Sequence, residues 1–495
     1  MPIPSDNLPP RTQAPDTTVV EDFLAHFAML AAVPRPSGHE QAVSDRLKAW
    51  GGKLGFNVRQ NAVWDLVIDV PPTPGLENSP VVGLQAHLDM VCVGRDGRDY
   101  DALRDPVVLL VDRAAGTLKA DGTSLGADDG AGVALAMSIA EGRMPHGPLR
   151  LIFTADEEVG MTGARALTPE DLRGVKYLVN IDSEASDAMT VSSAADCELL
   201  ATASLQPAAP TMDAALEISI VGLSGGHSGM EIASGRCNAI VALADTLARI
   251  GDSLPFELAS FSGGTAKNAI PAKARATIVV ETSDRAKVEA IVSDRAAELE
   301  SAHARTDPGL CLQTAHAPLP ETVMPAEATA RLLRYLAATP NGVLAMSQAI
   351  EGLVETSSNL GRLEAAPDRI WCLQMPRSSD PVKLREIEAR QTVLARECDL
   401  AMEIRPGSRA WPVNPASTLV PHFAEIYRTL TGRPMRVVAL HAGLECGILS
   451  ELAPGLDIVS IGPDIDAVHS PNETLRLSSI PLIWHLLEHL LANPA

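Results

Sequence analysis

The stretch LRLIFTADEE (residues 149–158) decides how this chain is organised. Its first seven residues form a short, largely apolar run, which predicts a buried strand. Asp156, Glu157 and Glu158 follow at once, and a second apolar run, residues 177–181, ends in the same way at Asp182-Ser183-Glu184. Carboxylates gathered at strand ends are unfavourable unless a positive charge lies among them. A bound divalent metal is the simplest candidate for that charge.

Other runs in the first half of the chain lead into side chains of the same kind. Residues 81–86 are typical of a buried strand and run into His87, and residues 118–127 lead into Asp128 and Asp129 before an Ala-rich helical stretch. Strands that alternate with helices indicate an α/β fold, in which ligands collect beyond the carboxyl ends of the strands. We therefore expect four side chains to meet at that edge: His87, Asp128, Glu158 and Asp182.

The pattern changes near Cys197. Strand-like runs and two helical runs, at 239–250 and 285–304, indicate an inserted α+β domain, and residues 406–412 are typical of a hinge back. The expected architecture is an α/β catalytic domain of three layers with a mixed central sheet, plus an inserted α+β lid domain. The predicted ranges are a disordered leader at 1–19, a discontinuous catalytic domain at 20–195 and 405–495, and the lid at 196–404.

Composition excludes several classes of function. The 495 residues are 46% hydrophobic and 21% charged, as in a globular protein with a large core, and the length favours more than one domain. A formal net charge of −22 argues against binding to nucleic acids or anionic membranes, which need a basic surface. The sequence contains neither a signal peptide nor an apolar run of ~18–20 residues. Seven scattered cysteines without a Cys-x-x-Cys pair favour free thiols in a reducing compartment, so a cytoplasmic location is predicted.

Each motif has a plainer interpretation when it is taken alone. The pair His87-x-Asp89 is common and usually structural, and Asp128-Asp129-Gly130 could equally be a turn or a helix cap. The joint set, with a late histidine at His469, favours a metal site instead. Two metals ~3.5–4 Å apart need a bridging carboxylate and a mixed imidazole and carboxylate shell, which suits zinc, manganese or cobalt. With one carboxylate kept off the metals as a general base, this is the chemistry of metal-assisted amide hydrolysis.

The sequence resembles the aminoacyl-histidine dipeptidases, which are cytosolic Xaa-His dipeptidases of the dinuclear zinc superfamily that also holds aminoacylases and carboxypeptidases. The resemblance runs from about residue 20 to the C-terminus, with the motifs in family order. The segments that carry it are HLDMVC (87–92), GADDG (126–130), DEEVG (156–160), NIDSE (180–184), GGHSG (225–229), GGTAKNAIP (263–271), HAGLECG (441–447) and HSPNE (469–473).

This resemblance implies two divalent metal ions per chain, with zinc the first candidate and cobalt or manganese the alternatives. Asp128 would bridge the two ions. The remaining ligands would be His87 and Asp182 on one ion, and Glu158 and His469 on the other. Glu157 would be the general base that activates the metal-bridging water, and Asp89 would orient His87.

The inserted domain would supply the residues that hold the substrate. His227 would bind the substrate carbonyl or the oxyanion, and in relatives it can come from the partner subunit of a homodimer formed through the lid. Asn268 and Arg377 would bind the substrate backbone and its C-terminal carboxylate, for which the planar guanidinium is well suited. Glu445 could meet the substrate amino group.

The predicted function is hydrolysis of small dipeptides of the Xaa-His type, such as carnosine-like substrates. Two alternatives stay open at this point. The first is an N-acyl amino acid deacylase with the same metals, which would need an acyl pocket near Glu445. The second is an inactive metal-binding scaffold or sensor, which predicts a missing ligand or base, and the sequence lacks neither.

Overall fold

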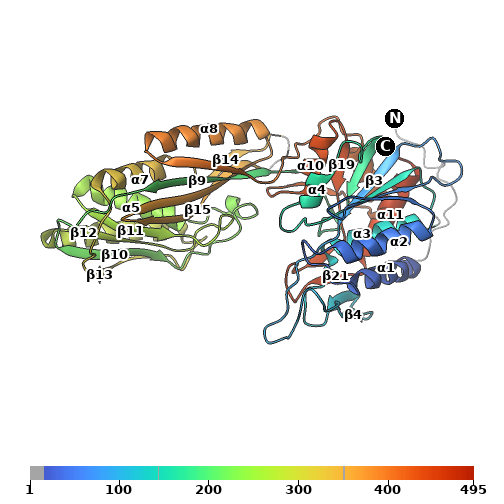
Figure 1. Cartoon of the computed structure of the whole chain (residues 1–495), viewed down its shortest axis with the longest axis horizontal. Coiled ribbons are helices and arrows are strands. Elements are labelled where there is room, and N and C mark those ends of the chain that lie inside the picture. The colour runs from blue at the N-terminus through green and yellow to red at the C-terminus, as the bar shows by residue number, and fades with distance from the viewer. Residues whose placement is uncertain (1–15, 143, 349, 351) are drawn as a thin grey trace. The chain divides into compact units, whose positions relative to one another are not determined.

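The structure is a computed structural model that describes residues 16–142, 144–348, 350 and 352–495 (Figure 1). It divides the chain into two compact units. Unit 1 comprises the described residues up to Val191, Val413–Val438 and Ile448–Ala495; unit 2 comprises Ser192–Pro412 and Ala439–Gly447. Residues 1–15 of the predicted leader lie outside the described residues. Residues 16–19 of that predicted leader are helical, because helix α1 begins at Asp16, so the prediction is wrong for these four residues.

The two units differ from the predicted domain ranges where the chain passes between them. Residues 192–195, 405–412 and 439–447 belong to unit 2 instead of the predicted catalytic domain. Backbone pairing accounts for this grouping. Ser193 forms a β-bridge with Trp411, and the Ala194 N–H lies 3.1 Å from the carbonyls of Leu440 and Ala442. These pairs tie the three connecting segments together, although they are far apart in the sequence.

Unit 1 is built on a mixed sheet of eight strands. Its order is β1 (Asn57–Gln60), β2 (Leu66–Val70), β6 (Leu149–Thr154), β3 (Val81–His87), β7 (Val175–Asn180), β19 (Asp457–Ser460), β8 (Ala188–Ser193) and β18 (Arg436–Leu440). Strands β6, β3, β7 and β19 are parallel, and β1, β2 and β8 are antiparallel to their neighbours. The side chains of β3, β6 and β7 are almost all buried on both faces, so both faces are covered. The predicted α/β class and mixed central sheet are confirmed.

The helices of unit 1 are mostly apolar where they meet the sheet or one another. They are α1 (Asp16–Ala31), α2 (Gln41–Lys53), α3 (Ala127–Glu141), α4 (Thr162–Ala166), α9 (Leu419–Thr431), α10 (Glu445–Leu452, which begins in unit 2) and α11 (Ser479–Ala492). A separate four-stranded sheet has the order β20 (Ile465–Asp466), β21 (Thr474–Arg476), β5 (Thr117–Ala120) and β4 (Leu109–Asp112). Helix α3 is buried around nearly its whole circumference and packs on β3, and this places its N-terminus near the end of that strand.

Unit 2 is a nine-stranded antiparallel sheet with helices on one face (Figure 1). The strands run in the order β13 (Cys311–Ala317), β10 (Ala214–Val221), β12 (Ala274–Val280), β11 (Glu257–Gly263), β15 (Val354–Ala366), β16 (Arg369–Ser378), β9 (Ala195–Ser204) and β17 (Ala401–Pro406), with β14 (Gly342–Met346) beside β15. The helices are η1 (Ile232–Ser234), α5 (Ala239–Ser253), η2 (Thr282–Asp284), α6 (Arg285–His303), α7 (Ala326–Ala338) and α8 (Pro381–Glu397). One continuous apolar core joins α5, α6 and α7 to the sheet.

Among the described residues, no helix is both long and apolar enough to cross a membrane.

Candidate metal centre and catalytic site

The parallel strands of unit 1 bring the predicted ligands to one edge of the sheet. His87 is the last residue of β3, Glu158 follows the end of β6 by four residues, and Asp182 follows the end of β7 by two. Strand β3 lies between β6 and β7 and is parallel to both, so the carboxyl ends of all three strands point the same way.

Asp128 lies between the two histidines of the cluster. Its Oδ1 is 3.0 Å from His87 Nε2, and its Oδ2 is 3.1 Å from His469 Nε2. On the outer side of each imidazole stands another carboxylate: Asp182 Oδ1 is 3.5 Å from His87 Nε2, and Glu158 Oε1 is 2.9 Å from His469 Nε2. One carboxylate therefore presents its two oxygens to two separate groups of ligands.

Asp89 connects the first histidine to the turn that carries the two glutamates. Its Oδ1 lies 3.3 Å from His87 Nδ1, and it accepts hydrogen bonds from the backbone N–H groups of Glu157 (3.0 Å) and Glu158 (3.2 Å) and from the Ser37 hydroxyl (2.7 Å). Burial opposes its ionisation, but the His87 contact and these donors hold the pKa of Asp89 at about 2. The ionised carboxylate thus fixes His87 and the Glu157–Glu158 turn together.

Asp129 is engaged by the backbone, unlike Asp128. Its Oδ2 accepts the His87 N–H at 3.1 Å and its Oδ1 accepts the Gly132 N–H at 3.0 Å. Its side chain still lies close to His87 and Asp182 as a possible ligand group. Burial, with a contribution from Asp182, raises its pKa well above the ordinary value. Its hydrogen bonds join the end of β3 to the start of α3.

Glu473 holds the loop that delivers Asp128. Its carboxylate accepts the backbone N–H groups of Leu125 (2.8 Å), Gly126 (3.0 Å) and Ala127 (2.7 Å). Burial raises its pKa, although these donors oppose the shift. The sequence motif that includes His469 contains Glu473, but motif reading assigned it no role. Its place four residues after a predicted ligand is the signal that could have found it.

Arg35 is a second residue that sequence reasoning missed. It is only 2% exposed, and its guanidinium donates to the carbonyls of Leu88 (2.7 Å), Asp89 (2.9 Å) and Gly126 (2.6 Å). The first two carbonyls follow His87, and the third precedes Asp128 by two residues. Arg35 therefore ties together the two loops that carry the first histidine and the central carboxylate.

Replacing Arg35 should destabilise unit 1. Arg35→Met leaves the buried carbonyls of Leu88 and Asp89 without this donor, and each unsatisfied group costs roughly 1–3 kcal/mol. The Gly126 carbonyl keeps the Gly130 N–H as a donor at 3.2 Å. We expect the melting temperature to fall by about 6 °C or more. Arg46→Met, which changes an exposed arginine on α2, is the matched control and should shift it by less than about 2 °C. Equal shifts for the two variants in a thermal unfolding measurement would contradict the structural role of Arg35.

The donor set fits a divalent cation centre. Burial raises the pKa of Asp182 to about 6 and that of Glu184 to about 7, with Asp128 adding to both shifts, and hydrogen bonds to Asp128 and Glu158 raise the pKa of His469 to about 10. The raised pKa values of these three groups mean that they bind protons more readily than usual, because a positive charge relieves the repulsion among the carboxylates. Two imidazole nitrogens together with the carboxylate oxygens are donors that zinc, manganese and cobalt accept.

Unit 2 brings together two of the predicted substrate residues. The segment at His227 pairs with residues 268–270: the Ser228 N–H donates to the Asn268 carbonyl at 2.8 Å, and the Ile270 N–H donates to the Gly226 carbonyl at 2.8 Å. The Asn268 side chain is exposed and His227 is half-buried. Both predicted residues therefore belong to one small piece of backbone pairing.

Arg377 belongs to a polar row across the sheet of unit 2. It pairs in register with Ser357 on β15 and with Asp196 on β9, and its Nη1 lies 3.5 Å from Asp196 Oδ2. The Ser357 hydroxyl lies 2.7 Å from Nε2 of His441. Burial, followed by the charge of Arg377, lowers the pKa of His441 to about 4, so this imidazole is neutral near pH 7.

Glu445 is fully buried at the start of α10, four residues after His441. Its predicted contact with a substrate amino group stays a prediction.

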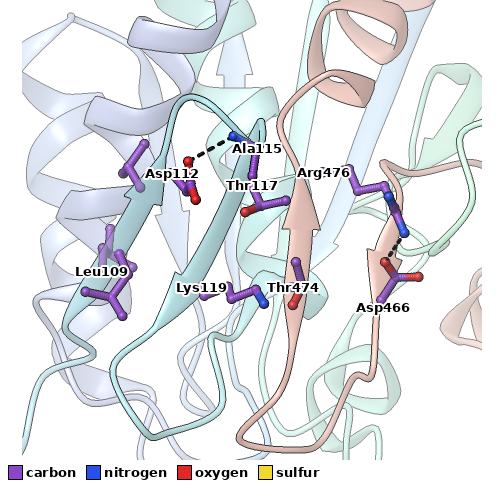
Figure 2. A pocket seen from close by; sticks show the side chains of 10 residues that line it. Leu109, Asp112, Ala115, Thr117, Lys119, Asp466, Thr474 and Arg476 are labelled. Atoms are coloured by element: carbon purple, nitrogen blue, oxygen red, sulfur yellow. Dashed lines mark hydrogen bonds and ion pairs between the residues drawn. The ribbon is translucent and has the colours of Figure 1, made fainter.

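A hollow of about 690 Å³ on unit 1 is separate from the predicted residues. Figure 2 shows it over the four-stranded sheet of β20, β21, β5 and β4. Its carboxylates already have partners: Asp112 accepts the Ala115 N–H at 2.9 Å, and Asp466 pairs with Arg476 at 2.7 Å. None of the described residues that line it is a predicted ligand or base.

A mixed α/β sheet with a cluster of imidazoles and carboxylates beyond the ends of its parallel strands is typical of a metal-dependent hydrolase. Residues 83–493 match the family model described as Peptidase family M20/M25/M40, and the chain belongs to this family. The resemblance inferred from the motifs is thereby confirmed at the level of the family, and the chain is a peptide hydrolase.

Individual relatives agree with this assignment. The cytosol non-specific dipeptidase of Escherichia coli (strain K12) is 32% identical over 467 residues, which are 94% of this chain and 96% of the relative. The crystal structure of an aminoacylhistidine dipeptidase from Vibrio alginolyticus superposes with a TM-score of 0.90 at 30% identity, covering 97% of this chain and 98% of that one. A tripeptidase from Staphylococcus aureus, at 17% identity and a TM-score of 0.55 over 96% of this chain and 98% of its own, shares the fold.

Proposed function

We propose that this chain is a dinuclear metallo-dipeptidase that hydrolyses small dipeptides, including those with histidine in the second position. The observation that carries the proposal is the Asp128 carboxylate, which lies within 3.1 Å of two imidazoles, each with a further carboxylate beside it. The names of the Escherichia coli and Vibrio alginolyticus relatives support a dipeptide substrate.

Two divalent ions would be held by five residues that share Asp128 as the bridge. His87 and Asp182 complete one site, and Glu158 and His469 complete the other. Zinc is our first candidate, with cobalt and manganese as alternatives. When bound, such ions would polarise the peptide carbonyl and make water a better nucleophile near neutral pH.

Glu157 would take the proton from the attacking water and pass it to the leaving amine. It precedes the ligand Glu158 by one residue, so the same turn can place one carboxylate as a ligand and leave the other to act as a base. Asp89 supports this division of roles, because its hydrogen bonds hold the backbone of both glutamates while its carboxylate faces His87. A fixed imidazole orientation is what a metal-ligating histidine requires.

His227 would donate a hydrogen bond to the developing oxyanion. His227→Ala should lower kcat by roughly 10²–10³-fold with little change in KM, because such a donor acts mainly in the transition state. Metal content and melting temperature should be unchanged. Steady-state kinetics with metal analysis checks this, and a change confined to KM would assign His227 to ground-state binding.

A mixing experiment tests whether His227 acts across a homodimer. Chains of His227→Ala and chains of Glu157→Gln are each expected to be nearly inactive. If activity reappears when the two variants are dissociated and reassembled together, His227 of one subunit completes the active site that contains Glu157 of the other subunit. Absence of complementation in verified heterodimers would place both residues in one chain.

The two ends of the dipeptide would be bound by unit 2. Arg377 suits the C-terminal carboxylate, since its guanidinium lies beside Asp196 and forms no ion pair with a second carboxylate among the described residues. Asn268 would bind the substrate backbone through its exposed amide, and Glu445 would meet the free amino group.

A substrate panel with metal analysis tests the proposal. Dipeptides with and without a second histidine, matched tripeptides and N-acetyl amino acids are assayed with the enzyme loaded with each metal in turn. We expect dipeptides to be cleaved and the other two groups to be poor substrates. Preferential cleavage of N-acetyl amino acids would make the chain a deacylase, and no hydrolysis by fully loaded protein would make it a scaffold or sensor.

The cellular setting is also proposed. The Escherichia coli relative is named a cytosolic enzyme, and the free cysteines of this chain suit a reducing compartment, so we propose a cytoplasmic location.

A further inference from the structure

The turn after His227 determines which ring nitrogen carries the proton. The backbone N–H groups of Gly229 and Met230 point at His227 Nδ1, at 3.3 Å and 3.2 Å. Backbone N–H groups can only donate, so Nδ1 must accept. A neutral imidazole has one protonated nitrogen, and here that nitrogen is Nε2. His227 therefore offers an Nε2–H donor.

The surroundings also keep this imidazole neutral. Burial lowers the pKa of His227, the charge of Arg377 lowers it further, and Glu231 opposes the shift. A neutral donor keeps its proton while the oxyanion forms, and it does not add a charge that must be desolvated.

Glu231 and Arg236 hold the backbone of this turn from both sides. Glu231 Oε2 accepts the His227 N–H at 2.8 Å, and the Glu231 N–H donates to the His227 carbonyl at 2.9 Å. Arg236 pairs with Glu231 Oε1 at 2.7 Å and donates to the Gly225 carbonyl at 2.5 Å. The ion pair thus holds the backbone at Gly225 as well as at His227.

Gly226 and Gly229 allow the side chains and backbone around His227 to approach closely, because neither glycine has a Cβ. Gly226 has φ +127°, and a Cβ there would lie 2.2 Å from Arg236 Nη1 and 2.3 Å from Glu231 Oε2. A Cβ at Gly229 would lie 2.5 Å from the His441 carbonyl and 3.0 Å from the His227 ring. The glycines of the GGHSG segment therefore serve close packing around one imidazole, in addition to turning the chain.

We infer that Glu231 and Arg236 are a positioning pair that holds His227 as an Nε2–H donor for catalysis. This inference rests on the proposed function, because the donor is assigned to the oxyanion of a peptide substrate. Neither residue is proposed to touch the substrate; both act through His227. If the ion pair had only a structural role, its loss would lower the stability of the turn and would not change the tautomer of His227.

The first test separates positioning from stability by kinetics. Glu231→Ala should lower kcat roughly 10- to 100-fold, because a misplaced group loses much of its effect, while KM, metal content and melting temperature change little. Glu231→Gln keeps an oxygen that can accept the His227 N–H and should restore most of the rate. Glu327→Ala, which breaks the exposed pair with Arg331 on α7, is the matched control and should behave as the wild type.

A double variant provides the stricter criterion. In the His227→Ala background, Glu231→Ala should cause no further loss of kcat, because the pair acts through the missing imidazole. A further loss of the same size as in the wild-type background would overturn the inference, and so would a Glu231→Ala variant with an unchanged kcat.

The second test needs no turnover and so separates this inference from the proposed function. In full-length protein labelled with ¹⁵N-histidine, the His227 signals are identified by their absence in His227→Ala. We expect an unprotonated Nδ1 and a protonated Nε2 in the wild type and in Glu327→Ala, and a mixture of tautomers in Glu231→Ala. The opposite tautomer in the wild type, or an unaltered Nε2–H form in Glu231→Ala, would overturn the inference even if the chain proved inactive on every dipeptide.

Discussion

Glu157→Gln is expected to abolish turnover while the protein keeps both metal ions. Glutamine preserves the shape of the side chain but cannot accept a proton, so the attacking water loses its base, and loss of general-base catalysis costs roughly 10²–10⁴-fold in rate. The Glu157 N–H bond to Asp89 belongs to the backbone and survives the change. Steady-state kinetics and elemental analysis of the same preparation provide the measurement.

The control for Glu157→Gln is Asp156→Asn, a like change one residue earlier. Asp156 is half-buried and its side chain contacts the Thr162 hydroxyl. We expect this variant to keep most of its activity. A near-wild-type rate for Glu157→Gln, or a loss of metal in it, would show that Glu157 is not the base.

Asp128→Ala is expected to bind markedly fewer than two metals per chain and to be inactive. A bridging carboxylate holds both ions and offsets their mutual repulsion, so its removal affects both sites at once. The two oxygens of Asp128 face two different imidazoles, which is the arrangement a bridge requires. Elemental analysis after dialysis, with cobalt absorption as a second readout, checks the expectation.

Asp129→Asn distinguishes the neighbouring carboxylate from the bridge. Asp129 accepts two backbone N–H groups, and asparagine keeps one acceptor oxygen of similar shape, so we expect two metals to remain with some loss of stability. Full occupancy in Asp128→Ala together with metal loss in Asp129→Asn would move the bridge to Asp129.

The α/β core could be predicted because its strands are apolar throughout. Strands β3, β6 and β7 are buried on both faces, and such strands appear in the sequence as short apolar runs followed by functional side chains. The predicted ligands follow from the same pattern, since parallel neighbours place their carboxyl ends together. The place of His469 beside Asp128, 341 residues away in the sequence, could be inferred only through resemblance to a family.

Several elements of unit 2 could not be predicted because their side chains are polar and yet buried. Strand β15 buries Ser357, Ser358 and Asn359, which break the apolar pattern of a strand. Tertiary partners satisfy them: Asn359 donates to the Ala269 carbonyl at 2.8 Å, and Ser357 lies 2.7 Å from His441. Helix α8 did carry a local signal, Asp380 as N-cap before Pro381, that the sequence reading did not use.

The sequence by itself therefore determined the fold class, the family and the set of candidate ligands, because periodic apolar runs and short motifs are local properties of the chain. Tertiary structure alone decided that Arg35 and Glu473 hold the ligand loops, that the connecting segments group with unit 2, and that His227 carries its proton on Nε2. These features depend on hydrogen bonds whose donor or acceptor is a backbone group. Every residue has such groups, so no side-chain pattern in the sequence identifies the ones that will be used.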